Sequence, residues 1–425
     1  MKTTTFTFLL ISFFAFSGLA QENHQLNPNL YGYGTWDADS LGNHRAVIKI
    51  ENAADIVLAH IPWRRRDFNP EQKAIIIVDA STGKQVNNVL PADINREFGD
   101  ILFQPATTPG EYYVYYLKHF MHGRSNYPTV TYPAFESKAE KGWLSKAQNS
   151  AKNLNSLPKS QLVQFQSIDP FNSFYPMEII ATKNEVEDLI KKNPADYLLF
   201  PEKRENSIRM TSDIPLKWIQ DGAANQITGR ALKGEYFTFQ LGVFAVQKQL
   251  ENIEVQFSGL SYRDSVVTDA EIFSSFNTEG TDLEGKHFKK TLDVEKGKVQ
   301  ALWIGVQIPE KITAGEYKSI IRIKPANSNE SEIELHLIIP EESILAHGDD
   351  EPGRLSRLRW LNSTLAEDDE IVAPYSALQL NGNTVSCLGR EVTFGKNGFP
   401  KASKVFILKV LQKSRKTEKK FWLHR

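Results

Sequence analysis

The stretch from Trp218 to Val246 constrains the fold most strongly, because its second half alternates with a period of two. One face of this alternation is apolar and holds Phe237, Phe239, Leu241 and Val243. The opposite face holds Tyr236, Thr238, Gln240 and Gly242. A period of two is that of a β-strand, and large apolar side chains on one face need a second sheet to cover them. The stretch therefore predicts a central strand of a β-sandwich.

Further short strands are expected on both sides of this stretch, at spacings of about ten residues and with turn signals between them. The N-terminal set comprises Ala46–Ile50, Ile56–Leu58, Ala74–Val78, Ile101–Phe103 and Glu111–Leu117. The second set comprises Ile253–Phe257, Ala270–Phe273, Val299–Ile308, Gly315–Ile323 and Ile333–Ile339. This spacing indicates sandwiches and not βαβ units.

The region between the two sets of strands changes to a helical pattern. Residues 134–154 are rich in Ala, Lys and Glu. A second helix is marked by a capping box of Thr182 and Glu185, and Asn193-Pro194 ends it. We therefore expect a helical insertion that packs on the first sheet or joins it to the second.

The C-terminal part begins with a charged linker, residues 348–353, followed by short strands near residues 378–380, 385–387 and 390–392. Small β domains need about 100 residues to cover both sheets, so a third domain begun here is incomplete. The predicted fold is mainly β, with two consecutive β-sandwich domains, a helical insertion between them and an incomplete third β domain. The expected ranges are a signal peptide at 1–20, sandwiches at 21–133 and 205–342, the helical insertion at 134–204, the truncated third domain at 343–400 and a basic, non-native-looking tail at 401–425.

Charge is distributed unevenly along the chain. The last 25 residues hold nine Lys or Arg against one Glu, a net of +8, whereas the whole chain of 425 residues carries −1. Residues 1–400 therefore carry −9. A body of this sign lacks the basic field that holds a polyanion, so no nucleic-acid partner is expected.

The first twenty residues have the pattern of a secretory signal peptide. Lys2 precedes an apolar run, Phe6–Phe16, that is too short to span a bilayer, and Gly18-Leu19-Ala20 predicts cleavage before Gln21. No later run reaches about 18 apolar residues, so no membrane partner is expected after cleavage. The single cysteine, Cys387, cannot form an intrachain disulfide. An exported chain without disulfides fits the periplasm, so periplasmic or secreted localisation is expected.

The segment Trp63-Arg64-Arg65-Arg66-Asp67 is the most suggestive short motif. A Trp face can stack on a sugar ring, and Arg forks donate in pairs to carboxylate or hydroxyl oxygens. The structural alternative is a strand end in which Arg stems pack over Trp63 and one Arg pairs with Asp67. The residues proposed for carbohydrate binding are Trp36, Trp63, Arg65 and Trp218.

Other candidate chemistry favours structural interpretations. The acidic clusters 349–351 and 368–370 lie in a linker and a loop, where water keeps the carboxylates ionised, whereas glycoside hydrolysis needs a desolvated pair. His119 and His122 have the spacing of two metal ligands on a helical face but lack a third ligand. No P-loop and no GxSxG elbow occurs. We therefore assign no catalytic residue, metal or cofactor site.

Three stretches together resemble one family: residues 229–245, residues 302–309 with 314–317, and residues 353–363. The combination is similar to the N-terminal β-sandwich region of exported Bacteroidetes proteins of the glycoside hydrolase family 123 type. The resemblance implies a longer parent, in which the sandwiches precede a (β/α)₈-type barrel. In that barrel an adjacent Asp–Glu pair assists the substrate's N-acetyl group in attacking the anomeric carbon. No residue of this chain matches that pair.

Three functions follow from these observations. The favoured one is a non-catalytic N-terminal portion of a glycoside hydrolase, inactive alone, with a downstream catalytic barrel as its partner. The alternative is a stand-alone periplasmic carbohydrate-binding module, which needs exposed, coplanar aromatic rings and a glycan partner. An enzyme in its own right would hydrolyse aryl N-acetyl-β-hexosaminides.

Overall fold

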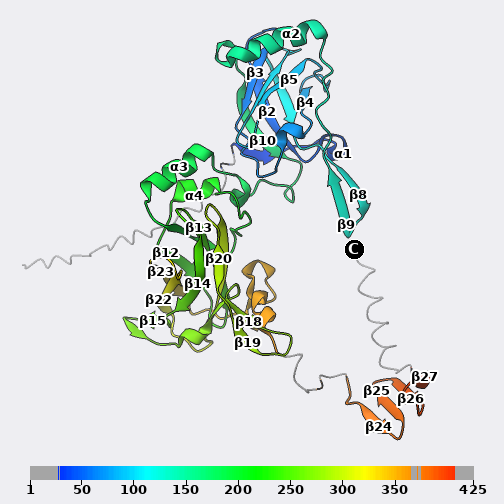
Figure 1. Cartoon of the computed structure of the whole chain (residues 1–425), viewed down its shortest axis with the longest axis vertical. Coiled ribbons are helices and arrows are strands. Elements are labelled where there is room, and N and C mark those ends of the chain that lie inside the picture. The colour runs from blue at the N-terminus through cyan, green and yellow to red at the C-terminus, as the bar shows by residue number, and fades with distance from the viewer. Residues whose placement is uncertain (1–26, 28, 365–370, 372–374, 407–425) are drawn as a thin grey trace, which may run out of the picture. The chain divides into compact units, whose positions relative to one another are not determined.

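The computed structural model describes residues 27, 29–364, 371 and 375–406, and the chain within them is mainly β (Figure 1). It divides into two compact units, residues 1–280 with 288–361, and residues 281–287 with 362–425. The predicted signal peptide, the acidic cluster 368–370 and most of the basic tail lie outside the described residues. In the described part of the chain, no helix is both long and apolar enough to cross a membrane.

The first sandwich packs a five-stranded sheet against a three-stranded one. The larger sheet has the order β1 (Tyr31–Tyr33), β10 (Gln161–Ser167), β2 (His44–Ile50), β7 (Gly110–Tyr115), β4 (Ile76–Asp79). The smaller sheet has the order β3 (Val57–Ile61), β6 (Gly99–Phe103), β5 (Val89–Ile94). Ile48, Val114 and Phe103 are fully buried in the cluster between them. The five strands predicted here from sequence are confirmed, with shifts of one to three residues at their ends.

The segment predicted as a helical insertion contains helices and also a strand. Helix α2 (Lys141–Ser150) continues into the 3₁₀ turn η2 (Ala151–Ser156). It buries Trp143 and Ala147 against Leu58 and Leu102 of the smaller sheet. The chain then forms β10, which pairs antiparallel with β2 and completes the first sandwich. Helix α3 (Lys183–Lys192) begins with the predicted capping box of Thr182 and Glu185.

The second sandwich contains the predicted central strand. Its first sheet has the order β11 (Tyr197–Lys203), β13 (Tyr236–Ala245), β21 (Val299–Gln307), β17 (Phe273–Ser275). The facing sheet has the order β12 (Gln226–Arg230), β23 (Ser331–Ile339), β22 (Gly315–Lys324), β14 (Leu250–Phe257), β20 (Leu292–Val294), with β15 (Ser261–Tyr262) and β16 (Ser265–Val266) at one side. Phe239 and Leu241 of β13 share a buried cluster with Ile321 and Leu335 of the facing sheet. Residues 270–272, expected as strand, form the 3₁₀ turn η4, and the strand starts at Phe273.

Strand β13 is buried on both faces, which exceeds the expectation from its alternation. All ten of its residues are buried. The outer face is covered by helix α4 (Leu216–Asp221), whose Trp218 ring lies directly over Gly242. On the same face Gln240 accepts the Ile208 N–H at 2.8 Å, and Thr238 Oγ1 donates to the Arg354 carbonyl at 2.9 Å. The sheet that contains β13 therefore forms the middle one of three packed layers.

The second unit contains a four-stranded antiparallel sheet: β24 (Gln379–Asn381), β25 (Thr384–Cys387), β26 (Arg390–Phe394) and β27 (Pro400–Val405). The first three strands are the predicted ones, and β27 was not predicted. None of the described residues from 375 to 406 is buried. The sheet therefore has a single layer in the part of this unit that the structure describes.

Candidate functional site

A cavity of about 260 Å³ lies where the first sandwich meets the segment that leads to α3. The sandwich supplies His44, the predicted motif Trp63–Asp67, and Tyr116 and Leu117 after β7. The other wall comes from residues 173–175 with Glu178 and Ile179, and Tyr132 completes the lining. Five lining residues are aromatic, and five carry a charge. An apolar surface with a few fixed polar groups is the usual chemistry of a small-molecule site.

The motif adopts its shape because its backbone is tied to the β5–β6 connection. The N–H groups of Arg64 and Arg65 donate to the carbonyls of Glu97 and Arg96 at 3.0 and 2.7 Å. Trp63 Nε1 donates to the Asn95 carbonyl at 2.8 Å, which fixes the indole at the base of the cavity. The side chains of Arg64, Arg65 and Arg66 extend from this fixed backbone segment toward different carboxylates.

Each of the three arginines has its own carboxylate. Arg64 makes two hydrogen bonds to Glu185, at 2.7 and 2.8 Å. Arg65 makes two to Asp67, at 2.9 and 2.7 Å. Arg66 Nη1 lies 3.4 Å from Glu178 and is half exposed. The Arg65 side chain is only 3% exposed.

One buried donor at this site lacks an acceptor. Nε and Nη2 of Arg65 bind Asp67, while its buried Nη1 has no hydrogen-bond partner. Its guanidinium carbon lies 4.9 Å from the Trp63 ring and 5.1 Å from the Tyr116 ring. Tyr116 also lines the cavity and is 2% exposed. A buried donor without an acceptor costs about 1–3 kcal/mol, so Arg65 Nη1 favours a ligand oxygen.

Asp67 and His44 of the cavity have fixed charge states near neutral pH. Burial alone would raise the pKa of Asp67, but hydrogen bonds and charge from Arg65 and Lys73 lower it below its ordinary value. Burial lowers the pKa of His44, whose Nε2 lies 2.7 Å from the Asn172 carbonyl. Asp67 is therefore ionised and His44 neutral. Neither is poised to donate a proton to a leaving group.

A carboxyl group with the opposite shift lies elsewhere. Burial raises the pKa of Glu202 on β11, although Lys217, Trp218 and Asn206 donate hydrogen bonds to it. Glu202 is 3% exposed and lines none of the three described cavities. Its raised pKa is a consequence of core burial under α4.

The structure separates the four residues proposed for carbohydrate binding. Trp63 and Arg65 both line the cavity, but as a buried pair, with Arg65 held by Asp67 as in the structural alternative. Trp218 is 1% exposed and stacks on Phe200 at 4.3 Å. Trp36 is half-buried, with the Arg45 guanidinium 4.5 Å from its ring. These residues therefore form no exposed, coplanar platform, because their rings already pack on protein groups.

Sequence reasoning missed most of the aromatic lining. Tyr116 ends the aromatic run after β7, and Phe174 and Tyr175 precede the 3₁₀ turn η3 (Pro176–Glu178). Tyr132 is 43% exposed, and Lys73 Nζ lies 4.2 Å from its ring centre. The aromatic run at residues 111–117 was the available signal, but nothing in the sequence places residues 173–175 opposite it.

Of the predicted histidine pair, His122 lies on a hairpin and His119 directly precedes it, so the two do not share a helical face. Strands β8 (Phe120–Arg124) and β9 (Tyr127–Thr131) form an antiparallel ribbon whose ten residues are all exposed (Figure 1). His122 Nε2 lies 2.9 Å from Thr131 Oγ1, and His119 Nδ1 lies 3.0 Å from the Leu117 carbonyl. The described residues include no group of three or more side chains placed to hold a metal.

The acidic cluster 349–351 is solvated only in part. It lies directly after the 3₁₀ turn η5 (Ala346–Gly348), and Asp350 and Glu351 are exposed whereas Asp349 is half-buried. Asp349 accepts hydrogen bonds from both terminal nitrogens of Arg359 and from Ser356 Oγ. The Arg359 bonds lower the pKa of Asp349 from 3.8 to about 2, against the raising effect of burial. The expectation of a water-exposed cluster was wrong for Asp349, because residues only seven to ten positions later fold back onto it.

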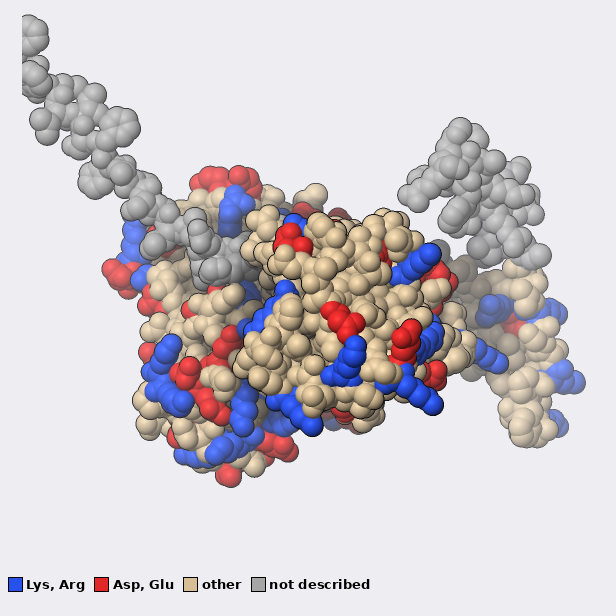
Figure 2. Space-filling view, turned by 90° about the horizontal axis from the view of Figure 1, so that it is seen from above, with Lys and Arg blue, Asp and Glu red and all other residues tan. Residues whose placement is uncertain are grey.

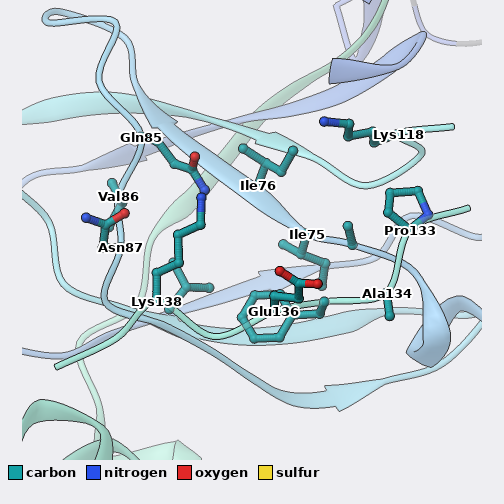
Figure 3. Close-up of a pocket in the computed structure, with 13 residues that line it drawn as sticks. Ile75, Ile76, Gln85, Val86, Asn87, Lys118, Pro133, Ala134, Glu136 and Lys138 are labelled. Atoms are coloured by element: carbon teal, nitrogen blue, oxygen red, sulfur yellow. The ribbon is translucent and has the colours of Figure 1, made fainter. Parts of the chain in front are cut away.

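Two further cavities are lined by the sandwiches. One, of about 230 Å³, lies beside β4, and in Figure 3 Lys138 extends toward Gln85 while Glu136 lies near Ile75. The other, of about 630 Å³, lies on the outer face of β22 and β23 beside the β15–β16 turn. On the face shown in Figure 2, acidic and basic residues are interspersed over wide uncharged areas. That face carries no single-sign patch of the kind that binds a polyanion.

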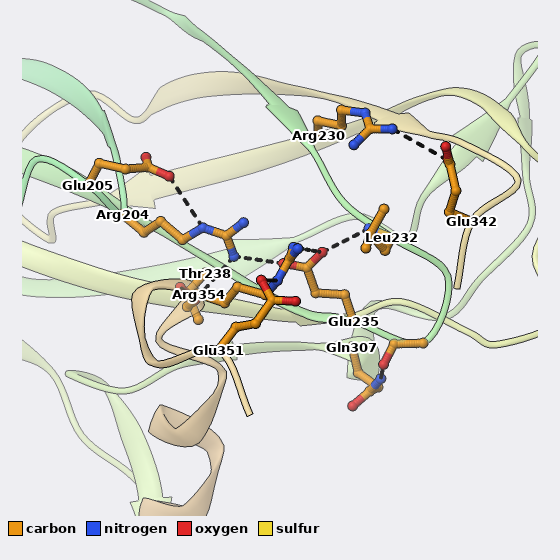
Figure 4. A network of polar contacts seen from close by, with 11 residues as sticks. Arg204, Glu205, Arg230, Leu232, Glu235, Thr238, Gln307, Glu342, Glu351 and Arg354 are labelled. Carbon is orange, nitrogen blue, oxygen red and sulfur yellow. Dashed lines mark hydrogen bonds and ion pairs between the residues drawn. The ribbon is translucent and has the colours of Figure 1, made fainter. Parts of the chain in front are cut away.

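A buried ion network joins the end of the second sandwich to β13 (Figure 4). Glu235 is fully buried and accepts hydrogen bonds from Arg204 Nη1 at 2.7 Å, Arg354 Nη1 at 3.0 Å and the Leu232 N–H at 2.8 Å. Arg354 lies in the 3₁₀ turn η6 (Pro352–Arg354), just before η7 (Ser356–Asn362). The network therefore holds the segment after β23 against the sandwich.

The first sandwich matches a known protein family. Residues 34–168 match the family described as Glycoside hydrolase 123, N-terminal domain. The range runs from just after β1 to just after β10. The chain is thus a mainly β protein whose first sandwich matches a glycoside hydrolase N-terminal domain. The predicted resemblance is confirmed for this range, although the three stretches that suggested it lie outside the range.

Solved structures with similar parts include a family 123 glycoside hydrolase from Clostridium perfringens, at 13% identity and a TM-score of 0.27. That match covers 34% of this chain and 27% of the enzyme, so the chain spans about a quarter of the enzyme's length. The CupB2 chaperone of Pseudomonas aeruginosa matches at 12% identity and a TM-score of 0.20, covering 43% of this chain and 98% of the chaperone. No curated protein matches the chain.

Proposed function

We propose that this chain is the non-catalytic β-sandwich portion of a glycoside hydrolase of the family 123 type. Its role is to support a catalytic barrel supplied by residues beyond those given. The observation that carries the proposal is the match of residues 34–168 to the N-terminal domain of that family. The N-acetyl-hexosaminide class of substrate is inferred from the same match.

The charge states of the candidate cavity support a non-catalytic role. Glycoside hydrolysis uses two carboxyl groups across the scissile bond, one of them protonated near neutral pH. The two carboxylates of this cavity are Asp67, bound by Arg65 and Lys73, and Glu178, which faces Arg66 and Arg209. Hydrogen bonds and charge from Arg65 and Lys73 lower the pKa of Asp67, so Asp67 is not a proton donor near neutral pH.

The buried network at Glu235 supports the role of a rigid base. Glu235 and Thr238 of the β13 region both contact Arg354, and Asp349 binds Arg359. The segment that follows the second sandwich is therefore held to the sandwich at Arg354, and the Asp349–Arg359 pair folds that segment onto itself.

Hydrolysis of aryl N-acetyl-β-hexosaminides by the purified chain tests the proposal. We expect no turnover, because the proposal places the catalytic carboxyl pair in the barrel and because Asp67, the cavity carboxylate bound by Arg65 and Lys73, is not a proton donor. Export to the periplasm or medium is part of the same proposal. N-terminal sequencing of the mature protein should then begin at Gln21, and a retained Met1 would contradict it.

A further inference from the structure

The cavity at Trp63–Asp67 has an excess of positive charge. Its lining and the groups paired to that lining include five cations, namely Arg64, Arg65, Arg66, Lys73 and Arg209. They face three carboxylates, Asp67, Glu178 and Glu185. Five cations against three carboxylates leave two positive charges, and His44 adds none. A partly enclosed site with this excess attracts an anion.

The hydrogen-bond donors of the cavity specify which kind of atom the ligand must present. Arg65 Nη1 is buried and lacks an acceptor. Tyr116, whose ring lies 5.1 Å from the Arg65 guanidinium carbon, also lines the cavity and carries a hydroxyl that can donate. Arg66 is half exposed, and only a 3.4 Å contact holds it to Glu178. An acceptor-only group such as a carboxylate suits these donors.

The size of the cavity and its exposed aromatic residue restrict the class of ligand further. A volume of about 260 Å³ lies at the small end of ligand sites, which suits one ring and not a chain. Tyr132 lines the cavity and is 43% exposed, so its ring can contact a ligand ring that presents C–H groups. A carboxylate attached to a polar ring meets both requirements.

We infer that this cavity binds an acidic monosaccharide, a uronic acid, with its carboxylate directed at Tyr116 and Arg66 and its ring against Tyr132. This binding site is separate from the proposed support of a catalytic barrel. Either can fail without the other, because the support role does not involve the cavity.

Isothermal titration of the full chain with D-glucuronate, D-glucose and acetate tests the inference. Glucuronate should bind at least tenfold more tightly than either glucose, which lacks the charge, or acetate, which lacks the ring. Binding should weaken with added salt, because the attraction is partly between charges. Equal affinity for glucuronate and glucose, equal affinity for glucuronate and acetate, or no binding of glucuronate, would each overturn it.

Two variants test the location of the binding site, and a third serves as the control. Y116F keeps the ring and removes the hydroxyl, so glucuronate affinity should fall about three- to tenfold, the contribution of one hydrogen bond. R66Q alters an exposed side chain and should weaken glucuronate binding with little effect on folding. The matched control is Y127F, because Tyr127 is 81% exposed on β9 and lines none of the three described cavities. Unchanged glucuronate affinity in both Y116F and R66Q would place the ligand elsewhere.

Discussion

Glu235 Oε2 and Arg354 Nη1 lie 3.0 Å apart although 119 residues separate them in the chain. The pair links the start of β13 to the segment after β23, because Glu235 directly precedes β13 and Arg354 follows β23, the last strand of the facing sheet along the chain. Arg204 Nη1 donates a hydrogen bond to the other oxygen of the Glu235 carboxylate. A carboxylate with no exposed surface tolerates its charge only because these donors surround it.

Replacing Glu235 by Gln should therefore destabilise the second sandwich. The change leaves two guanidinium groups without their buried counter-charge, and breaking such a pair costs about 3–5 kcal/mol. We expect faster tryptic cleavage at Arg354, Arg357 and Arg359 under native conditions, as the segment loosens. E342Q is the control, because the Arg230–Glu342 pair is exposed and should contribute less than about 1 kcal/mol. Equal cleavage rates in the two variants would contradict this role of Glu235.

Gly242 leaves the space that the Trp218 ring occupies. A Cβ at this position would lie 2.4 Å from Trp218 Cη2, and Trp218 is itself stacked on Phe200 with an angle of 2° between the rings. G242A should destabilise the protein by about 1–3 kcal/mol, measured by urea unfolding with tryptophan fluorescence. G142A, in α2 with no atom near its Cβ position, should instead stabilise by about 0.5–1 kcal/mol.

The capping box of α3 also orients a residue at the cavity. Thr182 Oγ1 accepts the Glu185 N–H, and Glu185 in turn binds both the Thr182 N–H and Arg64. T182A should lower stability by about 1 kcal/mol, the usual cost of losing an N-cap. Thermal unfolding followed by circular dichroism measures the change. S145A, which removes a hydroxyl from the exposed side of α2, should change stability by less than about 0.5 kcal/mol.

The Asp349–Arg359 pair predicts a specific acid dependence. The folded protein lowers the pKa of Asp349 from 3.8 to about 2, so the carboxylate stabilises the fold above pH 3.8. That contribution is lost as the pH falls from 3.8 through about 2. The difference in unfolding free energy between the natural protein and D349N should therefore be constant near neutral pH and shrink over this range. A difference that grows on acidification would contradict the pairing.

Local patterns in the sequence predicted what depends on neighbouring residues. The apolar face of β13 and the capping box at Thr182 follow from spacing within one segment. The burial of the outer face of β13 could not be predicted, because it depends on Trp218 and Arg354 folding back from distant positions. Strand β10 was missed because only Phe165 and Ser167 of its seven residues are buried, which leaves a weak alternation.

The candidate site, like the fold, could be predicted only in part from the sequence. Trp63 and Arg65 could be proposed from one short motif, and Asp67 was recognised as a partner for an arginine in it. The opposite wall, with Phe174 and Glu178, reaches the motif only through the tertiary fold. The unpaired donor on Arg65 likewise could not be predicted from the sequence, because it depends on which acceptors lie nearby.

The central claim is that these residues support catalysis without performing it, and a hydrolysis assay tests this most directly. The purified chain is incubated at high concentration with aryl N-acetyl-β-glucosaminide and N-acetyl-β-galactosaminide from acidic to neutral pH. The family 123 glycoside hydrolase of Clostridium perfringens serves as the positive control. We predict no release of the aryl group above the buffer rate. Turnover that co-purifies with the chain through repeated purification would contradict the account.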